Sequence, residues 1–463
     1  MVQGVSSGAG KSLLVCGLCR SLARRGIRVA PFKAQNMSNN ARVVDGGEIG
    51  TAQWLQALAA RVTPEVRMNP VLLKPENDLR SQVVVLGRAS RELTDAPWRG
   101  RSKRLWPEVL AAFESLRADF DVIVLEGAGS PAESNLWDDD IVNMAMAEAA
   151  NACVLLVADI DRGGAFAHLY GTWALLPPVW RRRIKGFVLN RFRGDPALLD
   201  PAPAELEALT GVPTVGVVPW LDHHLPDEEG PSRRFSPWRP GRRVALVCGP
   251  YASNLDEFVG LQQVSDVRLV GDDGRIEDAD LVILPGSKHV AADLAWLRRT
   301  GIAEQVLAAA AAGVPVLGIC GGLQALGTRI EDPAGVEGEA AGLGLLPIVT
   351  TYDSDKRTVR TTARFGSLPG SWTWLEGRSV TGYEIRHGRS EATADNRAFA
   401  LPAGLCYALD NVIGVYLHGL FENAAVLKAF SGSEPEPLDT VFDGLADAVD
   451  LHIDDRWLAR HLL

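Results

Sequence analysis

One cysteine lies between a hydrophobic run and a predicted helix in the stretch VPVLGICGGLQALG, residues 314–327. The turn GICGG has the pattern of a nucleophile elbow, in which a strand ends, the nucleophile occupies a sharp turn and a helix begins. Such a turn exposes the sulfur of Cys320, and the N-terminal end of the following helix favours the thiolate. The pattern therefore predicts that Cys320 is a nucleophile.

A thiol nucleophile needs an oxyanion site and a base, and the sequence offers candidates for both. The backbone N–H of Gly321 follows the nucleophile, and a second donor is expected from the loop LPGSK at Gly286 or Ser287. The stretch VIGVYLHGLFEN places His418 just after a β-rich run, where it can act as the base. We expect Cys320 and His418 to meet in the folded chain. The other cysteines and most other histidines are typical of core or surface positions.

A second motif, GVSSGAGKS, opens the chain between a short strand and an amphipathic segment. Its glycines let successive backbone amides point at phosphate oxygens, while a lysine adds positive charge and a serine hydroxyl can bind Mg²⁺. Val5 stands where the usual GxxxxGK[ST] loop has its first glycine, so that glycine comes one residue early. We predict a nucleotide site that uses Gly4, Gly8, Gly10, Lys11 and Ser12.

The stretch FDVIVLEGAGSPAE supports the nucleotide site. Glu126 ends a buried strand, and ligands of α/β proteins bind at the carboxyl edge of the sheet. A carboxylate there can hold Mg²⁺ opposite Ser12, directly or through water. The alternative is a solvated glutamate at the start of a loop, but the glycines that follow favour close approach of a ligand.

The strands that must position these residues are short apolar runs that alternate with helix-like segments. In the first half they are IRVAPF, FDVIVLE, ACVLLVAD, IKGFVLN and TVGVVP, and in the second RVALVCG, DVRLVG, ADLVILPG and PVLGIC. Continuous apolar strands that alternate with helices predict parallel sheets covered on both faces. The fold class is therefore α/β, with two doubly wound domains.

Length and composition predict a globular protein with more than one domain. The chain has 463 residues, 47% of them hydrophobic, and a net charge of −10, which argues against a nucleic-acid surface or a polybasic membrane anchor. No apolar stretch is long enough to cross a bilayer, and no secretory leader is recognisable at the start, so we expect a cytoplasmic location. A Pro-rich, charged stretch at 219–243 divides the chain. The expected domains are residues 1–230 and 242–430, with a helical tail at 431–463.

Both halves resemble known families. GICGG with the downstream YLHGLF is similar to the class I glutamine amidotransferases, in which a cysteine attacks the amide of glutamine and releases ammonia. The first half is similar to the carboxylate-activating synthetases related to dethiobiotin synthetase, whose loop also has five residues between its first glycine and GK[ST]. With PFKAQNMSNN, DGGEIGTAQWLQA, EGAGSPAESNL and GFVLNRFRGD, the order of motifs closely resembles the adenosylcobyric acid synthase family of cobalamin biosynthesis.

The resemblance implies a reaction and its reactants. With ATP and Mg²⁺, a carboxylate is activated as an acyl phosphate, and ammonia from L-glutamine then displaces phosphate. The implied corrin substrate is adenosylcobyrinic acid a,c-diamide, whose b, d, e and g carboxylates are amidated. Lys33 is expected near the phosphates or the substrate carboxylate. Asp45 and Glu48 are candidates for a second Mg²⁺ ligand or a substrate contact, or else surface charge, and Asn190 is a candidate for the adenine edge.

One departure from the family pattern concerns the base. The broader amidotransferase class has a glutamate two residues after the histidine, whereas this chain has Leu420 there and its next glutamate at Glu422. We therefore expect a Cys320–His418 dyad. The alternatives are cobyrinic acid a,c-diamide synthase, which amidates two acetates, and a P-loop regulatory ATPase with an inactive amidotransferase-like binding domain. An intact Cys320 and His418 argue against the second.

Overall fold

The computed structural model describes residues 1–77, 80–226, 241–272, 274–393, 400–401 and 403–462. It divides the chain into two compact units. Unit 1 comprises residues 1–38, 44–223 and 437–463, and unit 2 comprises residues 39–43 and 224–436. Most of the expected linker lies at 227–240, outside the described residues.

Unit 1 is built on parallel strands, because its apolar runs are buried on both faces. Strands β1, β10, β11 and β12 form one parallel sheet in that order, and β2 pairs in parallel with β9. A parallel bridge between Val2 and Glu126 places the end of β9 beside β1. The strands are β1 (Val2–Gly4), β2 (Val29–Phe32), β3 (Gln35–Met37), β5 (Gly47–Gly50), β6 (Val71–Asn77), β7 (Arg80–Val85), β8 (Arg88–Ala89), β9 (Val122–Leu125), β10 (Val154–Asp159), β11 (Ile184–Phe192) and β12 (Thr214–Pro219).

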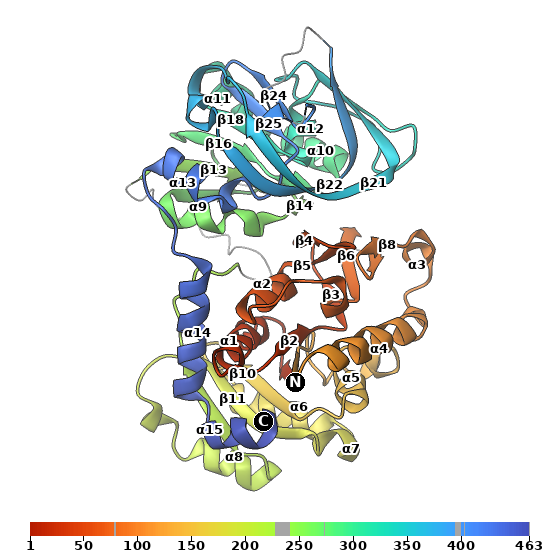
Figure 1. Ribbon diagram of the computed structural model, residues 1–463, viewed down its shortest axis with the longest axis vertical. Coiled ribbons are helices and arrows are strands. Elements are labelled where there is room, and N and C mark those ends of the chain that lie inside the picture. The colour runs from red at the N-terminus through yellow and green to blue at the C-terminus, as the bar shows by residue number, and fades with distance from the viewer. Residues whose placement is uncertain (78–79, 227–240, 273, 394–399, 402, 463) are drawn as a thin grey trace. The chain divides into compact units, whose positions relative to one another are not determined.

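The helices of unit 1 include two from the end of the chain. They are α1 (Lys11–Arg24), α2 (Thr51–Ala59), α3 (Arg91–Asp95), α4 (Arg101–Asp119), α5 (Met144–Ala149), α6 (Ala165–Leu175), α7 (Pro178–Arg181), α8 (Ala202–Thr210), α14 (Leu438–His452) and α15 (Asp455–Leu462). Helix α14 lies along α1 (Figure 1), where Gly17 approaches the backbone of Leu445 and Arg20 pairs with Asp439 and Asp443. The expected tail therefore belongs to the first unit from residue 437 onward, because its acidic face meets the arginines of α1.

Unit 2 has a six-stranded sheet in the order β15-β13-β16-β18-β25-β24, parallel except for the edge strand β24. The strands of the unit are β13 (Arg243–Val247), β14 (Ala252–Ser253), β15 (Asp266–Val270), β16 (Leu281–Leu284), β17 (Gly286–Ser287), β18 (Val316–Ile319), β19 (Arg329–Glu331), β20 (Ala340–Ala341), β21 (Ile348–Phe365), β22 (Ser379–Ala392), β23 (Ala400–Leu401), β24 (Cys406–Leu409) and β25 (Val412–Val415). Its helices are α9 (Val259–Val264), α10 (Val290–Thr300), α11 (Ile302–Ala311), α12 (Gly321–Leu326) and α13 (Ala424–Ser431). The doubly wound α/β class is confirmed for both units.

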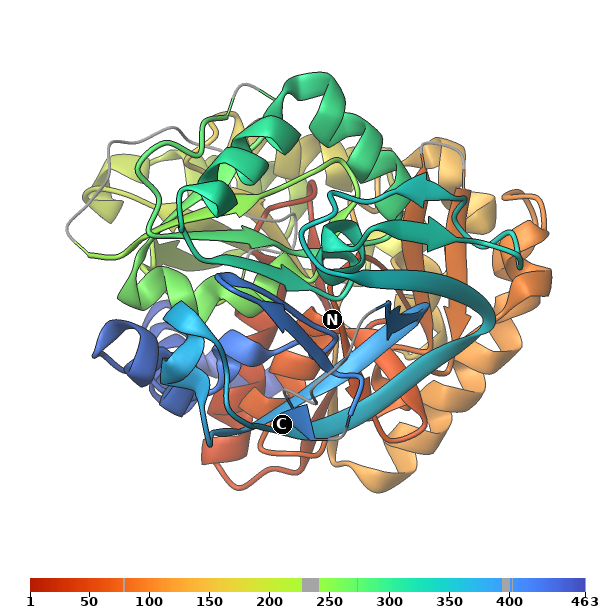
Figure 2. The same ribbon diagram turned by 90° about the horizontal axis from the view of Figure 1, so that it is seen from above.

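Each strand expected from the sequence is present, and the structure adds further sheets to each unit. In unit 2 the long strands β21 and β22 pair in antiparallel fashion and curve together (Figure 2). In unit 1 the strands β3, β6, β7 and β8 form a small mixed sheet. Strand β4 (Ala41–Val44) begins within the segment 39–43, which clusters with unit 2 although it lies early in the sequence.

Candidate active sites

Cys320 occupies a strained turn between β18 and α12. Its φ of 50° lies in the left-handed region that a non-glycine residue rarely adopts, as a nucleophile elbow requires. Its amide donates to Val415 O at 2.8 Å, which fastens the turn beside β25. A Cβ on Gly322 would lie 1.9 Å from Leu284 O, and one on Gly321 would lie 2.6 Å from Ser287 N. The two glycines are therefore needed because the 284–287 loop passes directly over the elbow.

His418 reaches Cys320 because it follows the neighbouring strand. Strands β18 and β25 are adjacent and parallel, so their carboxyl ends meet at one edge of the sheet. The His418 imidazole hydrogen-bonds the Cys320 side chain. Burial disfavours the imidazolium, but the Glu257 carboxylate and the Cys320 sulfur outweigh burial and raise the pKa of His418.

Glu257 supplies an acid that the sequence analysis did not name. Its Oε1 lies 2.8 Å from His418 Nδ1, and its Oε2 accepts the N–H of Gly419 at 2.7 Å. An ionised carboxylate only accepts, so Nδ1 carries the proton and Nε2 is left for the thiol. The carboxylate beside His418 is thus Glu257, from the 3-10 helix Leu255–Phe258, whereas Glu422 contacts Arg42. No spacing rule links Glu257 to His418, and the adjacent acids of SNLDEF are too common a signal to have identified it.

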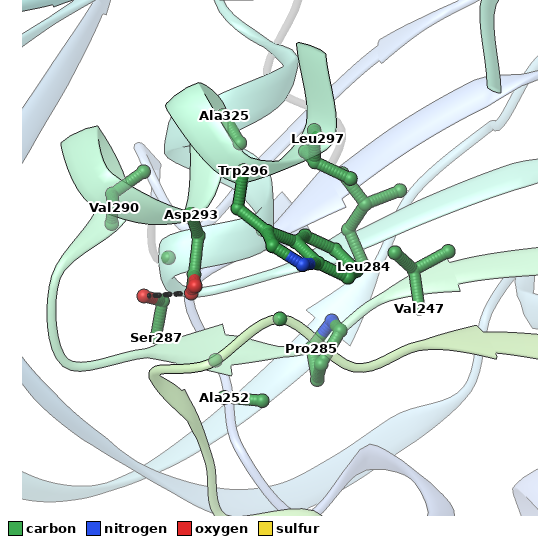
Figure 3. Close-up of a pocket in the computed structure, with 14 residues that line it drawn as sticks. Val247, Ala252, Leu284, Pro285, Ser287, Val290, Asp293, Trp296, Leu297 and Ala325 are labelled. Carbon is green, nitrogen blue, oxygen red and sulfur yellow. Dashed lines mark hydrogen bonds between the residues drawn. The ribbon is translucent and has the colours of Figure 1, made fainter. Parts of the chain in front are cut away.

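The loop that carries Gly286 is held beside this pair. A Cβ on Gly286 would lie 2.8 Å from His418 Cε1, so the loop passes close to the imidazole. Ser287 Oγ donates to Asp293 Oδ2 at 2.6 Å (Figure 3), and Asp293 also accepts from the Tyr251 amide. Burial raises the pKa of Asp293.

A small, mostly apolar pocket lies against the loop, lined among others by Val247, Leu284, Pro285, Trp296 and Leu297. The oxyanion roles of Gly286 and Gly321 stay predictions.

A second buried carboxylate, Glu337, lies on the same side of unit 2 as Cys320. Its Oε2 accepts from the Tyr352 hydroxyl at 3.0 Å, and that hydroxyl also contacts Gln324 Oε1 on α12. Burial raises the pKa of Glu337 to about 7, although the charge of Lys288 opposes the change. Burial raises the pKa of Tyr352, and the neighbouring Glu337 carboxylate raises it further. The sequence analysis did not single out any of these residues.

In unit 1 the glycine-rich loop leads directly into α1. Gly8 and Gly10 have φ values of 67° and 91°, which only glycine adopts readily. Lys11 Nζ donates to Ser6 O at 3.0 Å and to Gly129 O at 3.3 Å, so its amine lies between this loop and the loop after Glu126. Gly4 is equally confined, because a Cβ there would lie 2.9 Å from Ser6 O. The loop therefore has the curled backbone that phosphate binding requires.

Glu126 is the centre of a buried polar network at the carboxyl ends of β2 and β9. Its Oε1 accepts from Ser12 Oγ and from Lys33 Nζ, each at 2.8 Å, and its Oε2 accepts from Gln56 Nε2. Glu126 is 1% exposed. Among the described residues no group of three or more His, Cys, Asp or Glu side chains is placed to hold a metal. The Ser12 hydroxyl and the Glu126 carboxylate are oxygen donors of the kind that Mg²⁺ prefers, and their role as metal ligands stays a prediction.

The remaining candidates of unit 1 lie in different surroundings. Glu48 is buried and pairs with Lys74 Nζ at 2.8 Å, whereas Asp45 is exposed, so the structure does not bring these two carboxylates to Glu126. Asn190 Nδ2 donates to Ala9 O at 2.9 Å, which ties the end of β11 to the phosphate loop. The roles of Asp45, Glu48 and Asn190 toward ligands stay predictions.

Comparisons with known proteins match both units. Residues 1–229 match the CobQ/CobB/MinD/ParA nucleotide binding domain, and residues 243–426 match the CobB/CobQ-like glutamine amidotransferase domain. The chain is 55% identical to the cobyric acid synthase of Variovorax paradoxus (strain S110) over 465 residues, which cover 98% of this chain and 97% of that protein. The chain belongs to the cobyric acid synthase family.

A second cobyric acid synthase shows a similar degree of identity to this chain. The protein of Paracidovorax citrulli (strain AAC00-1) is 56% identical over 481 residues, with 99% of this chain and 98% of that protein covered. The family and the enzyme class expected from the sequence, a glutamine-hydrolysing ligase, are thereby confirmed. The nucleotide binding domain agrees with the expected use of ATP. Within the part of the chain that the structure describes, no helix combines the length and apolar character needed to span a membrane.

Proposed function

We propose that this cobyric acid synthase amidates the b, d, e and g carboxylates of adenosylcobyrinic acid a,c-diamide in cobalamin biosynthesis, using ATP and ammonia released from glutamine. The observation that carries the proposal is the placement of His418 between the Cys320 thiol and the Glu257 carboxylate. A nucleophile, a base and a group that orients the base are the parts needed for amide hydrolysis through a covalent intermediate. Family membership supports the corrin substrate.

In the glutaminase reaction, Cys320 Sγ attacks the side-chain amide carbon of glutamine while His418 holds the thiol proton. His418 then gives this proton to the departing ammonia, which leaves a thioester between Cys320 and the glutamyl group. Water, deprotonated by His418, hydrolyses the thioester and restores the thiol. The backbone amides of Gly321 and of Gly286 or Ser287 would donate to the oxyanion, which is supported by the close approach of the 284–287 loop to Gly321.

In the ligase reaction, a carboxylate oxygen of the corrin attacks the γ-phosphorus of ATP, and ADP leaves. Ammonia then attacks the acyl carbon of the resulting acyl phosphate, and inorganic phosphate leaves. Lys11 and the loop amides offset the charge on the phosphate oxygens, and Lys33 holds Glu126 in place. Mg²⁺, bound by Ser12 and Glu126, would supply further positive charge to the phosphates.

The test is glutamine hydrolysis and corrin amidation by the purified full chain, with and without ATP and the corrin acid. We expect glutamate release coupled to addition of four amide groups per corrin. His418→Ala should lower glutamine hydrolysis about as deeply as loss of the thiol, by roughly 100-fold or more. Full glutamine hydrolysis in this variant would contradict the proposed base.

Two other functions are separated by the same assay. Amidation of only the two acetates of cobyrinic acid would identify a cobyrinic acid a,c-diamide synthase. A protein that binds nucleotide but hydrolyses no glutamine would be a regulatory ATPase. The intact Cys320–His418–Glu257 arrangement favours the glutaminase over this last function.

A further inference from the structure

A short segment from the first half of the sequence is part of the glutaminase unit. Residues 39–43 cluster with unit 2, whereas the chain on either side of them, up to residue 38 and from residue 44, belongs to unit 1. The backbone of the segment is fastened there, because Asn254 Nδ2 donates to Ala41 O at 2.9 Å. The glutaminase unit therefore contains five residues that the ligase half of the chain supplies.

Arg42 lies in this segment, and its side chain is buried, with 5% of it exposed. Its Nη1 lies 2.5 Å from Asp256 Oδ2 and donates to the Tyr383 hydroxyl at 2.8 Å. Its Nη2 donates to Glu422 Oε1. Burial disfavours the guanidinium charge, but the carboxylates of Asp256 and Glu422 outweigh burial and raise the pKa of Arg42. The guanidinium is therefore a buried cation held by two acids.

These partners of Arg42 all adjoin the Glu257–His418 pair, either in sequence or in space. Asp256 precedes Glu257 in the same 3-10 helix, and Glu422 lies in the turn (Leu420–Glu422) that follows His418. The Tyr383 ring stacks on the His418 imidazole, with centroids 5.2 Å apart and an interplanar angle of 16°. Tyr383 and His418 also exchange backbone hydrogen bonds at 3.1 and 2.9 Å.

We propose that Arg42 is a positioning residue of the glutaminase: its guanidinium joins the segments that carry Glu257 and His418, so glutamine hydrolysis depends on a side chain from the ligase half. The inference rests on the proposed function of Cys320 and His418. Two Nη groups on one plane can hold Asp256 and Glu422 at the same time, which a point charge on a lysine cannot do. Residues 39–43 are covalently joined to unit 1 at both ends. A displacement of this segment would move Arg42 and so change the positions of Glu257 and His418.

The test compares Arg42→Met and Arg42→Lys in the full chain. For Arg42→Met we expect kcat for glutamine hydrolysis to fall between about tenfold and 100-fold, because a misplaced imidazole loses alignment with the thiol. KM for glutamine should change by less than about threefold, and ATP-dependent amidation with ammonium should stay within about twofold of the wild type. Arg42→Lys should have a kcat between those of Arg42→Met and the wild type, because it restores the charge but holds one acid at a time.

Two further variants serve as controls for folding. Arg42→Met removes the guanidinium beside the buried Asp256 carboxylate, which destabilises the fold. The double variant Arg42→Met/Asp256→Asn removes that charge and should melt close to the wild type, yet retain the deficit in kcat. Arg243→Met breaks a partly exposed pair with Asp280 at the start of β13, the opposite end of the sheet from Cys320, and should leave hydrolysis unchanged.

The outcomes separate this inference from the function on which it rests. Wild-type kcat in either folded variant that lacks the guanidinium would overturn the inference. An equal fall in glutamine-dependent and ammonium-dependent amidation would also overturn it, because that result indicates a general folding defect. Cys320→Ser and His418→Ala are measured in parallel: if they retain glutamine hydrolysis, the proposed function fails, whereas if they lose it and the Arg42 variants do not, only the role of Arg42 fails.

Discussion

Glu126 in unit 1 and Glu257 in unit 2 are both buried beside candidate site residues, and these two carboxylates have different partners. Glu126 in unit 1 accepts from Lys33 Nζ and from Ser12 Oγ, so its carboxylate lies beside a lysine and a hydroxyl. Glu257 in unit 2 pairs with His418, an imidazole that can accept and donate protons. The first arrangement suits a fixed binding site for phosphate and metal, and the second suits proton transfer.

The difference between the units predicts that loss of the thiol in unit 2 lowers amidation with glutamine but leaves amidation with ammonium. Cys320→Ser should lower glutamine-dependent amidation by about 10³-fold or more, since only the thiol attacks glutamine. Amidation with a high concentration of ammonium salt should remain close to the wild type. The measurement is corrin amidation with each nitrogen source, and unchanged turnover with glutamine would rule out Cys320 as the nucleophile.

A substitution in the phosphate loop of unit 1 should lower amidation with glutamine and amidation with ammonium alike. Lys11→Ala is expected to lower ATP-dependent amidation by about 100-fold to 1000-fold with either glutamine or ammonium, because carboxylate activation precedes ammonia attack. Glutamine hydrolysis and amidation are measured separately in the same samples. If amidation with ammonium continues at the wild-type rate, the nucleotide assignment is wrong.

Glu257→Gln tests the partner of His418. We expect glutamine hydrolysis to fall by about 100-fold, because an amide neither orients the imidazole as a carboxylate does nor stabilises its positive charge. The Glu257 carboxylate raises the pKa of His418, so its neutralisation should lower that pKa and move the limb of the pH–rate profile that reports His418 to lower pH.

Glu126→Gln is the matched change in unit 1. It should leave the pH profile of glutamine hydrolysis unchanged and lower amidation with both nitrogen sources. A shift of the glutaminase profile in Glu126→Gln, or no shift in Glu257→Gln, would contradict the difference drawn between the two carboxylates.

The smallest effect is expected at Glu422, which contacts Arg42 instead of His418. Its side chain is 33% exposed, and glutamine at this position keeps an oxygen that can accept from Arg42. Glu422→Gln should therefore change glutamine hydrolysis by less than about threefold. A loss as deep as that of His418→Ala would instead make Glu422 the acid of the triad.

Much of the fold and part of each site could be predicted from the sequence. The strands before Cys320, Glu126 and Asn190 were recognisable as apolar runs, and the glycine-rich turns followed from their local spacing. The long β21–β22 hairpin was not expected, because its exposed, polar strands have no continuous apolar run. The sequence predicts a separate helical tail at 431–463, since nothing local in α14 indicates that its acidic residues face α1.

The candidate reactive residues could be predicted from local sequence, because an elbow or a phosphate loop is made by neighbours in the chain whose backbone must turn sharply. Tertiary structure decided their partners. Glu257 reaches His418 across 161 residues and Arg42 reaches Tyr383 across 341, and in each case the contact exists only after the strands have taken their order in the sheet. A contact between a buried acid and a distant histidine or arginine produces no periodic pattern in the sequence, so local spacing could not predict the contact.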